Sequence, residues 1–105
     1  MPDDDLGARL RAGDPEALRA LYQRYAGAVL TVARAFLADR EAADDVVQQT
    51  FLQAWRAAHR IDPGRSLSPW LYQIARNCAI DALRRSARTP LAAAPSAEIA
   101  APGTP

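Results

Sequence analysis

The chain of 105 residues contains no lysine, one cysteine (Cys78) and one histidine (His59). A single cysteine excludes a disulfide within the chain. One cysteine and one histidine are too few for a zinc site of the usual kind, so we expect no metal centre. All thirteen basic residues are arginine. Arginine suits two-point contacts to phosphates and bases, although GC-rich coding, which also favours alanine, explains the same bias.

Long apolar runs and catalytic patterns are also lacking. No apolar run approaches the length of a membrane span, and the acidic opening MPDDDL lacks the basic segment of a signal peptide. We therefore expect a cytoplasmic protein without a membrane partner. The sequence offers no His–acid–nucleophile set, no evident pair of catalytic carboxylates and no Gly-rich phosphate loop. It is thus not expected to be an enzyme, to use a cofactor or to take a small-molecule substrate.

Charge is unevenly placed along the chain. Residues 1–53 carry nine acids against six arginines, a net charge of −3, whereas residues 54–105 carry three acids against seven arginines, a net charge of +4. Such polarity is typical of a protein whose later half meets an anion such as nucleic acid. For a shift this small, chance is an equally good explanation.

Apolar residues recur at three- and four-residue steps, which predicts helices over about 3–12, 15–37, 40–59 and 69–88. The helix starts carry capping signals at Asp14-Pro15, Asp39 and Ser68-Pro69, and Gly13 is expected to end the first helix. No strand-like alternation of useful length is present. We therefore predict an all-α fold, a compact three- to four-helix domain over residues 1–88. The Ala/Pro-rich residues 89–105 are expected to be a linker or disordered tail.

The same periodicity assigns a buried face to each long helix. On the first helix, Leu6 and Leu10 are expected to dock on the core. The predicted core positions of the second helix are Leu18, Leu21, Tyr22, Tyr25, Val29, Val32, Ala33 and Phe36. Those of the third helix are Ala43, Val46, Val47, Thr50, Phe51, Ala54 and Ala58. Those of the last helix are Leu71, Ile74, Ala75, Cys78 and Ala82, with Ala79 and Leu83 at the edge.

The outer face of the third helix combines acids and amides with two large apolar side chains, Leu52 and Trp55. That mixture is typical of a protein-binding surface. Packing of Leu52 and Trp55 under a neighbouring segment explains the pattern equally well. The candidate partner-binding residues are Asp45, Gln48, Gln49, Leu52 and Trp55.

The loop after the third helix and the outer face of the last helix carry a different chemistry. Asp62-Pro63-Gly64 is typical of a turn, and the N-terminus of the last helix at Ser68 favours an anion. An aromatic side chain, amides and arginines together suit single-stranded nucleic acid, although an ordinary solvated face has the same composition. The candidate residues are Arg60, Asp62, Arg65, Ser66, Ser68, Trp70, Gln73, Arg76, Asn77 and Arg84.

Three motifs follow one another in order: DDVVQQTFLQAW, DPGRSL and PWLYQIARNCAIDALRR. With their spacing they make the stretch from about Asp14 to Arg88 resemble region 2 of bacterial sigma-70-type sigma factors, of the extracytoplasmic-function (ECF) group. The resemblance implies an all-helical domain that binds RNA polymerase core and melts promoter DNA at the −10 element. It implies that the chain itself makes and breaks no covalent bond.

The resemblance also implies a role for each surface. The first motif is expected to dock on the coiled coil of the polymerase β′ subunit, which points to Asp45, Gln48, Gln49 and Trp55. The loop and the helix after it are expected to capture a flipped base of the non-template strand. That role falls on residues 60–68 together with Trp70, Gln73, Arg76 and Asn77.

Several positions depart from the family pattern. The family often has Glu at Gln49 and Arg at Ser68, Gln73 and Cys78, so fewer phosphate contacts are expected here. The chain also ends before region 4, the family's reader of the −35 element, and is not expected to direct full promoter-specific initiation by itself. The alternative interpretation is a protein-interaction module bound by an anti-sigma factor, without DNA binding of its own.

Overall fold

The computed structural model describes residues 3–62 and 64–88, which form four α-helices and one 3-10 turn. The helices are α1 (Asp3–Arg11), α2 (Pro15–Phe36), α3 (Arg40–Ala57) and α4 (Leu67–Arg88), with the 3-10 turn η1 (Ala58–Arg60) after α3. The predicted all-α class is confirmed. The predicted linker over residues 89–105 lies outside the described residues, as does Pro63 of the predicted turn.

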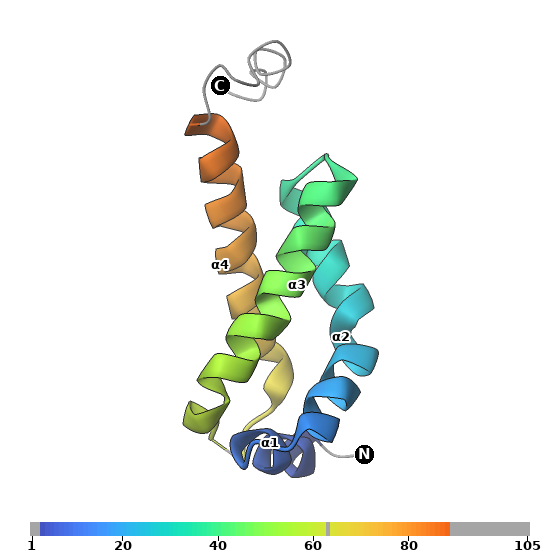
Figure 1. Ribbon diagram of the computed structural model, residues 1–105, viewed down its shortest axis with the longest axis vertical. Coiled ribbons are helices and arrows are strands. Elements are labelled where there is room, and N and C mark those ends of the chain that lie inside the picture. Colours follow the sequence, from blue (N-terminus) through green and yellow to red (C-terminus); the bar gives the residue numbers. More distant parts are fainter. Residues whose placement is uncertain (1–2, 63, 89–105) are drawn as a thin grey trace.

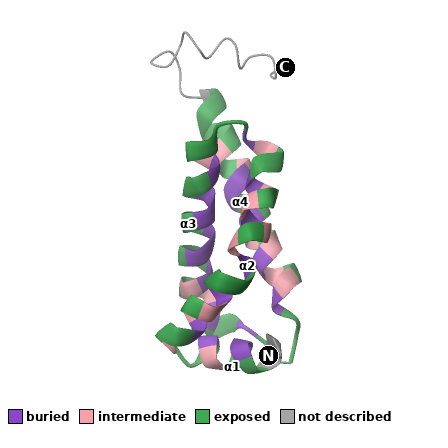
Figure 2. Cartoon of the chain, turned by 90° about the vertical axis from the view of Figure 1, so that its right-hand side faces the viewer, coloured by how far each residue is buried: buried purple, intermediate pink, exposed green. Residues whose placement is uncertain are grey.

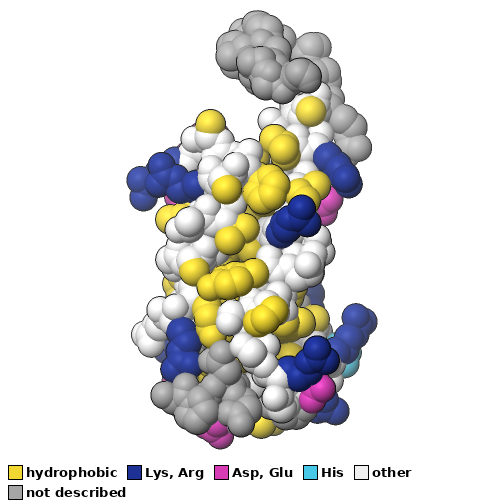
Figure 3. Space-filling view, turned by 180° about the vertical axis from the view of Figure 1, so that it is seen from behind, with side chains coloured by type: hydrophobic (Ala, Val, Ile, Leu, Met, Phe, Trp, Pro, Cys, Tyr) yellow, Lys and Arg dark blue, Asp and Glu magenta, His cyan; other side chains and the backbone are white. Residues whose placement is uncertain are grey.

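Three long helices form the body of the fold. Helices α2, α3 and α4 each pack against the other two, and α1 lies across one end of this bundle (Figure 1). At that end α1 contacts the start of α2, the turn η1 and α4, so it lies close to the connection between α3 and α4. On the rear face, hydrophobic side chains form a band along the molecule with arginines on either side (Figure 3). Tyr25 of α2 and Tyr72 of α4 meet edge to face, with ring centroids 6.3 Å apart.

The buried residues lie on the inner faces of the bundle, as the colours of Figure 2 show. Leu6 and Leu10 of α1 are almost fully buried, as predicted. Every core position predicted for the third helix is also buried: Ala43, Val46, Val47, Thr50, Phe51 and Ala54 in α3, and Ala58 in η1. The buried Thr50 hydroxyl donates to the carbonyl of Val46 at 2.7 Å, so its polar group is satisfied.

Two predictions for the edges of the core are wrong, those for Tyr22 and Ala79. Tyr22 is 41% exposed, although its ring contacts that of Phe51 on α3 edge to face. Leu83 is 45% exposed, in a run of exposed residues (83–87) near the end of α4. Ala79, expected at the edge, is fully buried instead.

Two of the three helix starts match the sequence prediction. The Asp14 carboxylate accepts the Glu16 N–H at 2.9 Å, and the Asp39 carboxylate accepts the Ala42 N–H at 3.1 Å. Ser68 is not the N-cap of α4, because that helix already begins at Leu67, whose side chain is buried in the core. Ser68 therefore lies inside the first turn. The predicted loop also begins later than expected, since residues 58–60 form η1.

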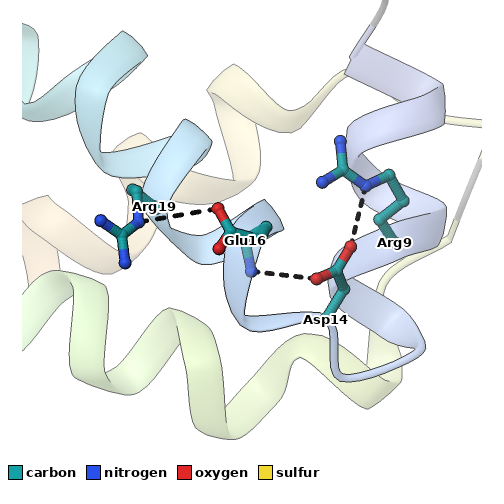
Figure 4. A network of polar contacts seen from close by, with 4 residues as sticks. All are labelled: Arg9, Asp14, Glu16 and Arg19. Atoms are coloured by element: carbon teal, nitrogen blue, oxygen red, sulfur yellow. Dashed lines mark hydrogen bonds and ion pairs between the residues drawn. The ribbon is translucent and has the colours of Figure 1, made fainter.

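A small polar network joins α1 to α2 (Figure 4). The Arg9 Nε lies 3.0 Å from one Asp14 carboxylate oxygen, while the other oxygen caps α2. Gly13 has a φ of +83°, which lets the chain turn sharply between the two helices, as its predicted role requires. One carboxylate thus fixes both the start of α2 and the position of α1.

Replacing Asp14 with asparagine is expected to lower the midpoint of thermal unfolding near neutral pH. The side chain of Arg9, and then the N–H of Glu16, hold the pKa of Asp14 below its ordinary value. The ionised carboxylate therefore stabilises the fold above about pH 4, and this contribution is lost as the pH falls through the lowered pKa. Asparagine still caps the helix but lacks the charge that pairs with Arg9. Thermal unfolding followed by circular dichroism should show the midpoints of the two proteins converging toward about pH 2. A difference between the midpoints that stays constant with pH would contradict the prediction.

Candidate functional site

A groove lies between α2 and α3, with a volume of about 520 Å³. We call it the α2–α3 groove. It is lined by Pro15, Leu18, Arg19 and Tyr22 of α2 and by Gln48, Gln49, Phe51, Leu52 and Trp55 of α3. No acidic side chain is among these lining residues.

The apolar side chains of the α2–α3 groove are partly open to solvent. The rings of Tyr22 and Phe51 meet edge to face with centroids 4.9 Å apart, and Phe51 is buried beneath. Leu52 is 43% exposed, whereas Trp55 is half-buried and packs against the main core. The sequence left two interpretations open, an exposed binding surface or packing under a neighbouring segment. Trp55 is partly packed, whereas Leu52 is exposed. An amphipathic helix of a partner fits such a surface.

Four of the five predicted partner-binding residues line the α2–α3 groove together: Gln48, Gln49, Leu52 and Trp55. Asp45 is exposed on the same helix, outside the lining. The sequence interpretation missed the contribution of α2. Leu18 and Tyr22 lie four residues apart on α2, beside the buried pair Leu21 and Tyr25. Together the four make an apolar stripe so wide that one of its edges is expected to remain exposed.

A second concavity lies where the α3–α4 connection meets the start of α4, with a volume of about 600 Å³. We call it the loop pocket. Its lining consists of Arg60, Ile61, Asp62, Arg65, Ser66, Leu67, Pro69 and Trp70. Ile61 and Leu67 are buried and form an apolar floor, Trp70 is half-buried, and the remaining polar residues are exposed. The volume lies within the range of small-molecule sites.

Hydrogen bonds within the connection hold the loop pocket in shape. The Arg65 N–H donates to the carbonyl of Asp62 at 3.0 Å, and the Gly64 N–H lies 3.3 Å from the Asp62 carboxylate. An aspartate that bonds the backbone two residues on is a usual way to fix a turn. At the other side of the pocket, α4 begins at Leu67, so its N-terminal end adds a partial positive charge. The two arginines and this helix end favour an anionic ligand.

Nine of the ten predicted nucleic-acid residues fall into two groups, and Ser68 belongs to neither. Five of them line the loop pocket: Arg60, Asp62, Arg65, Ser66 and Trp70. Ser68 is outside the lining, with its hydroxyl 3.5 Å from that of Ser66. The other four are exposed further along α4: Gln73, Arg76, Asn77 and Arg84. Among these, the Gln73 side-chain amide donates to the Asn77 side chain at 3.2 Å.

The floor of the loop pocket was not found as part of a site from the sequence. Ile61 and Leu67 lie within residues 60–68, the loop to which the resemblance gives a binding role, but neither was named individually as a candidate residue. Within residues 3–62 and 64–88, no group of three metal-ligating side chains occurs, and no helix has the length and apolar character needed to cross a membrane. Burial raises the pKa of the Cys78 thiol, which keeps this side chain protonated inside the core.

More than half of the chain matches a known protein family. The family model for Sigma-70 region 2 matches residues 21–89. The chain belongs to the sigma-70 region 2 family. The matched part contains all of α3, the loop pocket and α4. The resemblance seen in the three motifs is thereby confirmed.

Similar proteins include sigma factors of several bacteria. The chain is 39% identical over 83 residues to RNA polymerase sigma factor NccH of Alcaligenes xylosoxydans xylosoxydans, covering 79% of this chain and 44% of that protein. It is 41% identical over 78 residues to ECF RNA polymerase sigma factor SigL of Mycobacterium tuberculosis, covering 73% and 44%. The chain thus spans less than half the length of these curated relatives.

A solved structure of similar fold is an NMR structure of an engineered region 2 of sigmaE in complex with GTAAAA. The two chains superpose with a TM-score of 0.77 and are 34% identical, covering 87% of this chain and 96% of the other. This likeness extends over almost the whole of that domain.

Proposed function

We propose that this chain is the part of a sigma factor that joins RNA polymerase core and holds single-stranded −10 promoter DNA during transcription initiation. The observation that carries the proposal is the loop pocket, with its apolar floor, its tryptophan and its arginine rim. It lies in a domain whose structural neighbour was solved in complex with GTAAAA.

The loop pocket has the parts needed to hold one unstacked base. Removing a base from the stack costs a few kcal/mol. Stacking on an aromatic side chain returns about 1–3 kcal/mol per base, and Trp70 supplies that surface. Arg60 and Arg65 on the rim are placed to contact the flanking phosphates. The base enters over the buried floor of Ile61 and Leu67, which excludes water beneath it.

The exposed face of α4 then follows the strand away from the pocket. At a rise of about 1.5 Å per residue, Trp70 and Arg84 lie roughly 21 Å apart along the helix axis. The amides of Gln73 and Asn77 lie between them and offer donors and acceptors to base edges, while Arg76 and Arg84 offer charge to phosphates. In our proposal this face contributes less than the pocket, because its side chains lie on an open surface.

The α2–α3 groove is the proposed contact with polymerase. Its exposed Tyr22 and Leu52 and its half-buried Trp55 form an apolar centre, and Gln48 and Gln49 supply amides beside it. Interfaces commonly have such an aromatic anchor within a polar rim. The proposed partner is the coiled coil of the polymerase β′ subunit, and in this proposal Asp45, exposed on α3 three residues before Gln48, meets basic side chains of that partner.

A binding experiment tests both halves of the proposal. Fluorescently labelled single-stranded hexanucleotides, beginning with GTAAAA and varying each position, are titrated with the chain alone and with the chain plus polymerase core. We expect binding that depends on sequence and tightens when core is present. If no hexanucleotide binds in a sequence-dependent way under either condition, the DNA half of the proposal is wrong, and a domain bound by an anti-sigma factor becomes the better interpretation.

A further inference from the structure

We propose that α1 braces the loop pocket and that Arg11 is a positioning residue for the captured base, acting through the backbone of Ile61. This inference rests on the proposed function of the pocket. It concerns a helix that lies outside the residues matched by the family model and lines neither concavity.

The first support is a hydrogen bond across the chain. The Arg11 guanidinium Nη1 donates to the carbonyl of Ile61 at 2.7 Å, although fifty residues separate the two. A charged donor makes this bond shorter and stronger than a neutral one. Ile61 lies directly after η1 and before the Asp62 turn, so the bond fixes the residue at which the pocket's loop begins.

The second support is the close approach of α1 to the pocket floor. Gly7 is buried, and a methyl group at its Cβ position would lie 3.5 Å from both the Ile61 Cγ2 and the Leu67 Cδ2. The backbone of α1 at Gly7 is thus directly beneath the two residues that form the floor. Figure 1 shows the same arrangement, with α1 lying across the end of the bundle at which α3 passes into α4.

Helix α1 is itself held in place without Arg11. Leu6 and Leu10 are each 1% exposed, and Arg9 pairs with Asp14 at the start of α2. Arg11 is exposed overall, lies four residues after Gly7 on the same side of α1, and reaches the loop with its guanidinium. Its removal therefore leaves α1 docked and the core intact, and frees the loop alone. That separation makes the proposal testable by a single substitution.

The test compares Arg11→Met with Arg34→Met, which removes the same charge from an exposed position in the last turn of α2. Wild type and both variants are titrated with the hexanucleotide of the GTAAAA series that wild type binds best. They are also titrated with versions of this strand made abasic at one position at a time. We expect Arg11→Met to bind the intact strand about tenfold more weakly, the loss expected for one charged hydrogen bond. Once the strand is abasic at the captured position, Arg11→Met and wild type should bind equally. Arg34→Met should match wild type throughout.

Salt dependence separates positioning from direct phosphate contact. If Arg11 acts through Ile61, Arg11→Met keeps the wild-type slope of log affinity against log salt. A slope reduced by about 0.7 would mean that Arg11 binds a phosphate of the single strand itself, and would overturn the proposal. Hydrogen exchange without DNA gives an independent check. The hydrogen-bonded amides of Ile61, Gly64 and Arg65 should exchange faster in Arg11→Met while those of α3 are unchanged. Unchanged exchange at these three amides would also overturn the proposal.

Gly7 offers a second pair of variants. Gly7→Ala adds a methyl group at an ordinary contact distance and should preserve base-dependent binding. Gly7→Val adds two further carbons toward the floor and should weaken binding of the intact strand; wild-type binding by this variant would contradict the brace. The outcomes also separate the two proposals. If wild type binds intact and abasic strands equally, the proposed function fails, and the inference fails with it. If wild type and Arg11→Met prefer the intact strand over the abasic strand by the same factor, the inference alone is overturned.

Discussion

Replacing Gln48 and Trp55 together with alanine is expected to abolish association of the chain with RNA polymerase core. Both residues line the α2–α3 groove, and Trp55 provides its largest apolar side chain. Truncating a central aromatic anchor typically costs 2 kcal/mol or more of binding free energy, about thirtyfold in affinity. With the amide of Gln48 also removed, we expect a loss of at least about a hundredfold. Competition between the variant and labelled wild type for polymerase core measures this loss.

The matched control is Gln53→Ala on the same helix. Gln53 is exposed but does not line the groove, so its removal should leave core association unchanged. Because Trp55 also packs against the main core, circular dichroism must show that the double variant keeps its helix content. A folded double variant that still binds core with wild-type affinity would move the polymerase site to another surface.

Replacing Trp70 with alanine is expected to weaken binding of single-stranded DNA by about 5- to 150-fold, the loss that corresponds to one stacked base. Trp70 is the aromatic side chain of the loop pocket, and alanine there leaves the captured base without a stacking partner. Asn77→Ala should have a smaller effect. Asn77 lies two turns further along α4, outside the pocket, and its side chain already accepts a hydrogen bond from Gln73. Titration of labelled hexanucleotides measures both losses.

Ser86→Ala serves as the control for Trp70→Ala, because Ser86 is exposed near the end of α4 and far along the helix from the pocket. Both variants should bind polymerase core like wild type. If Trp70→Ala loses core binding and DNA binding to the same extent, the substitution has damaged the fold. If it retains wild-type DNA affinity with an intact fold, the loop pocket does not hold a base.

Local sequence signals predicted the helices and most of the core. Asp14 and Asp39 cap α2 and α3 as expected, since an N-cap depends on residues only two or three positions away. The buried face of α3 was also predicted in full, because its apolar residues repeat at the helical period over five turns. The start of α4 was placed two residues late, at residue 69 rather than Leu67. Ser68-Pro69 has the local pattern of a cap, but burial of Leu67 draws the preceding turn into the helix.

The shapes of the two concavities were not predictable in the same way. A helical period shows which face of α2 is apolar, but not where α3 stops covering it, and so Tyr22 was placed in the core. The floor of the loop pocket depends on α1, whose residues lie at least fifty positions before Ile61 and Leu67 in the sequence. The bond from Arg11 to the Ile61 carbonyl has no sequence pattern at all, because a backbone acceptor is present at every residue.

The two-surface account is tested most directly by recruitment of a labelled −10-type single strand to polymerase core, measured as fluorescence anisotropy with wild type, the Gln48→Ala/Trp55→Ala variant and Trp70→Ala. We predict that wild type brings the strand to core. The groove variant should still bind the strand alone but fail to bring it to core, while Trp70→Ala should occupy core without the strand. If both variants lose both activities together, or if either retains full recruitment, the division of the chain into a polymerase-binding groove and a DNA-binding pocket is contradicted.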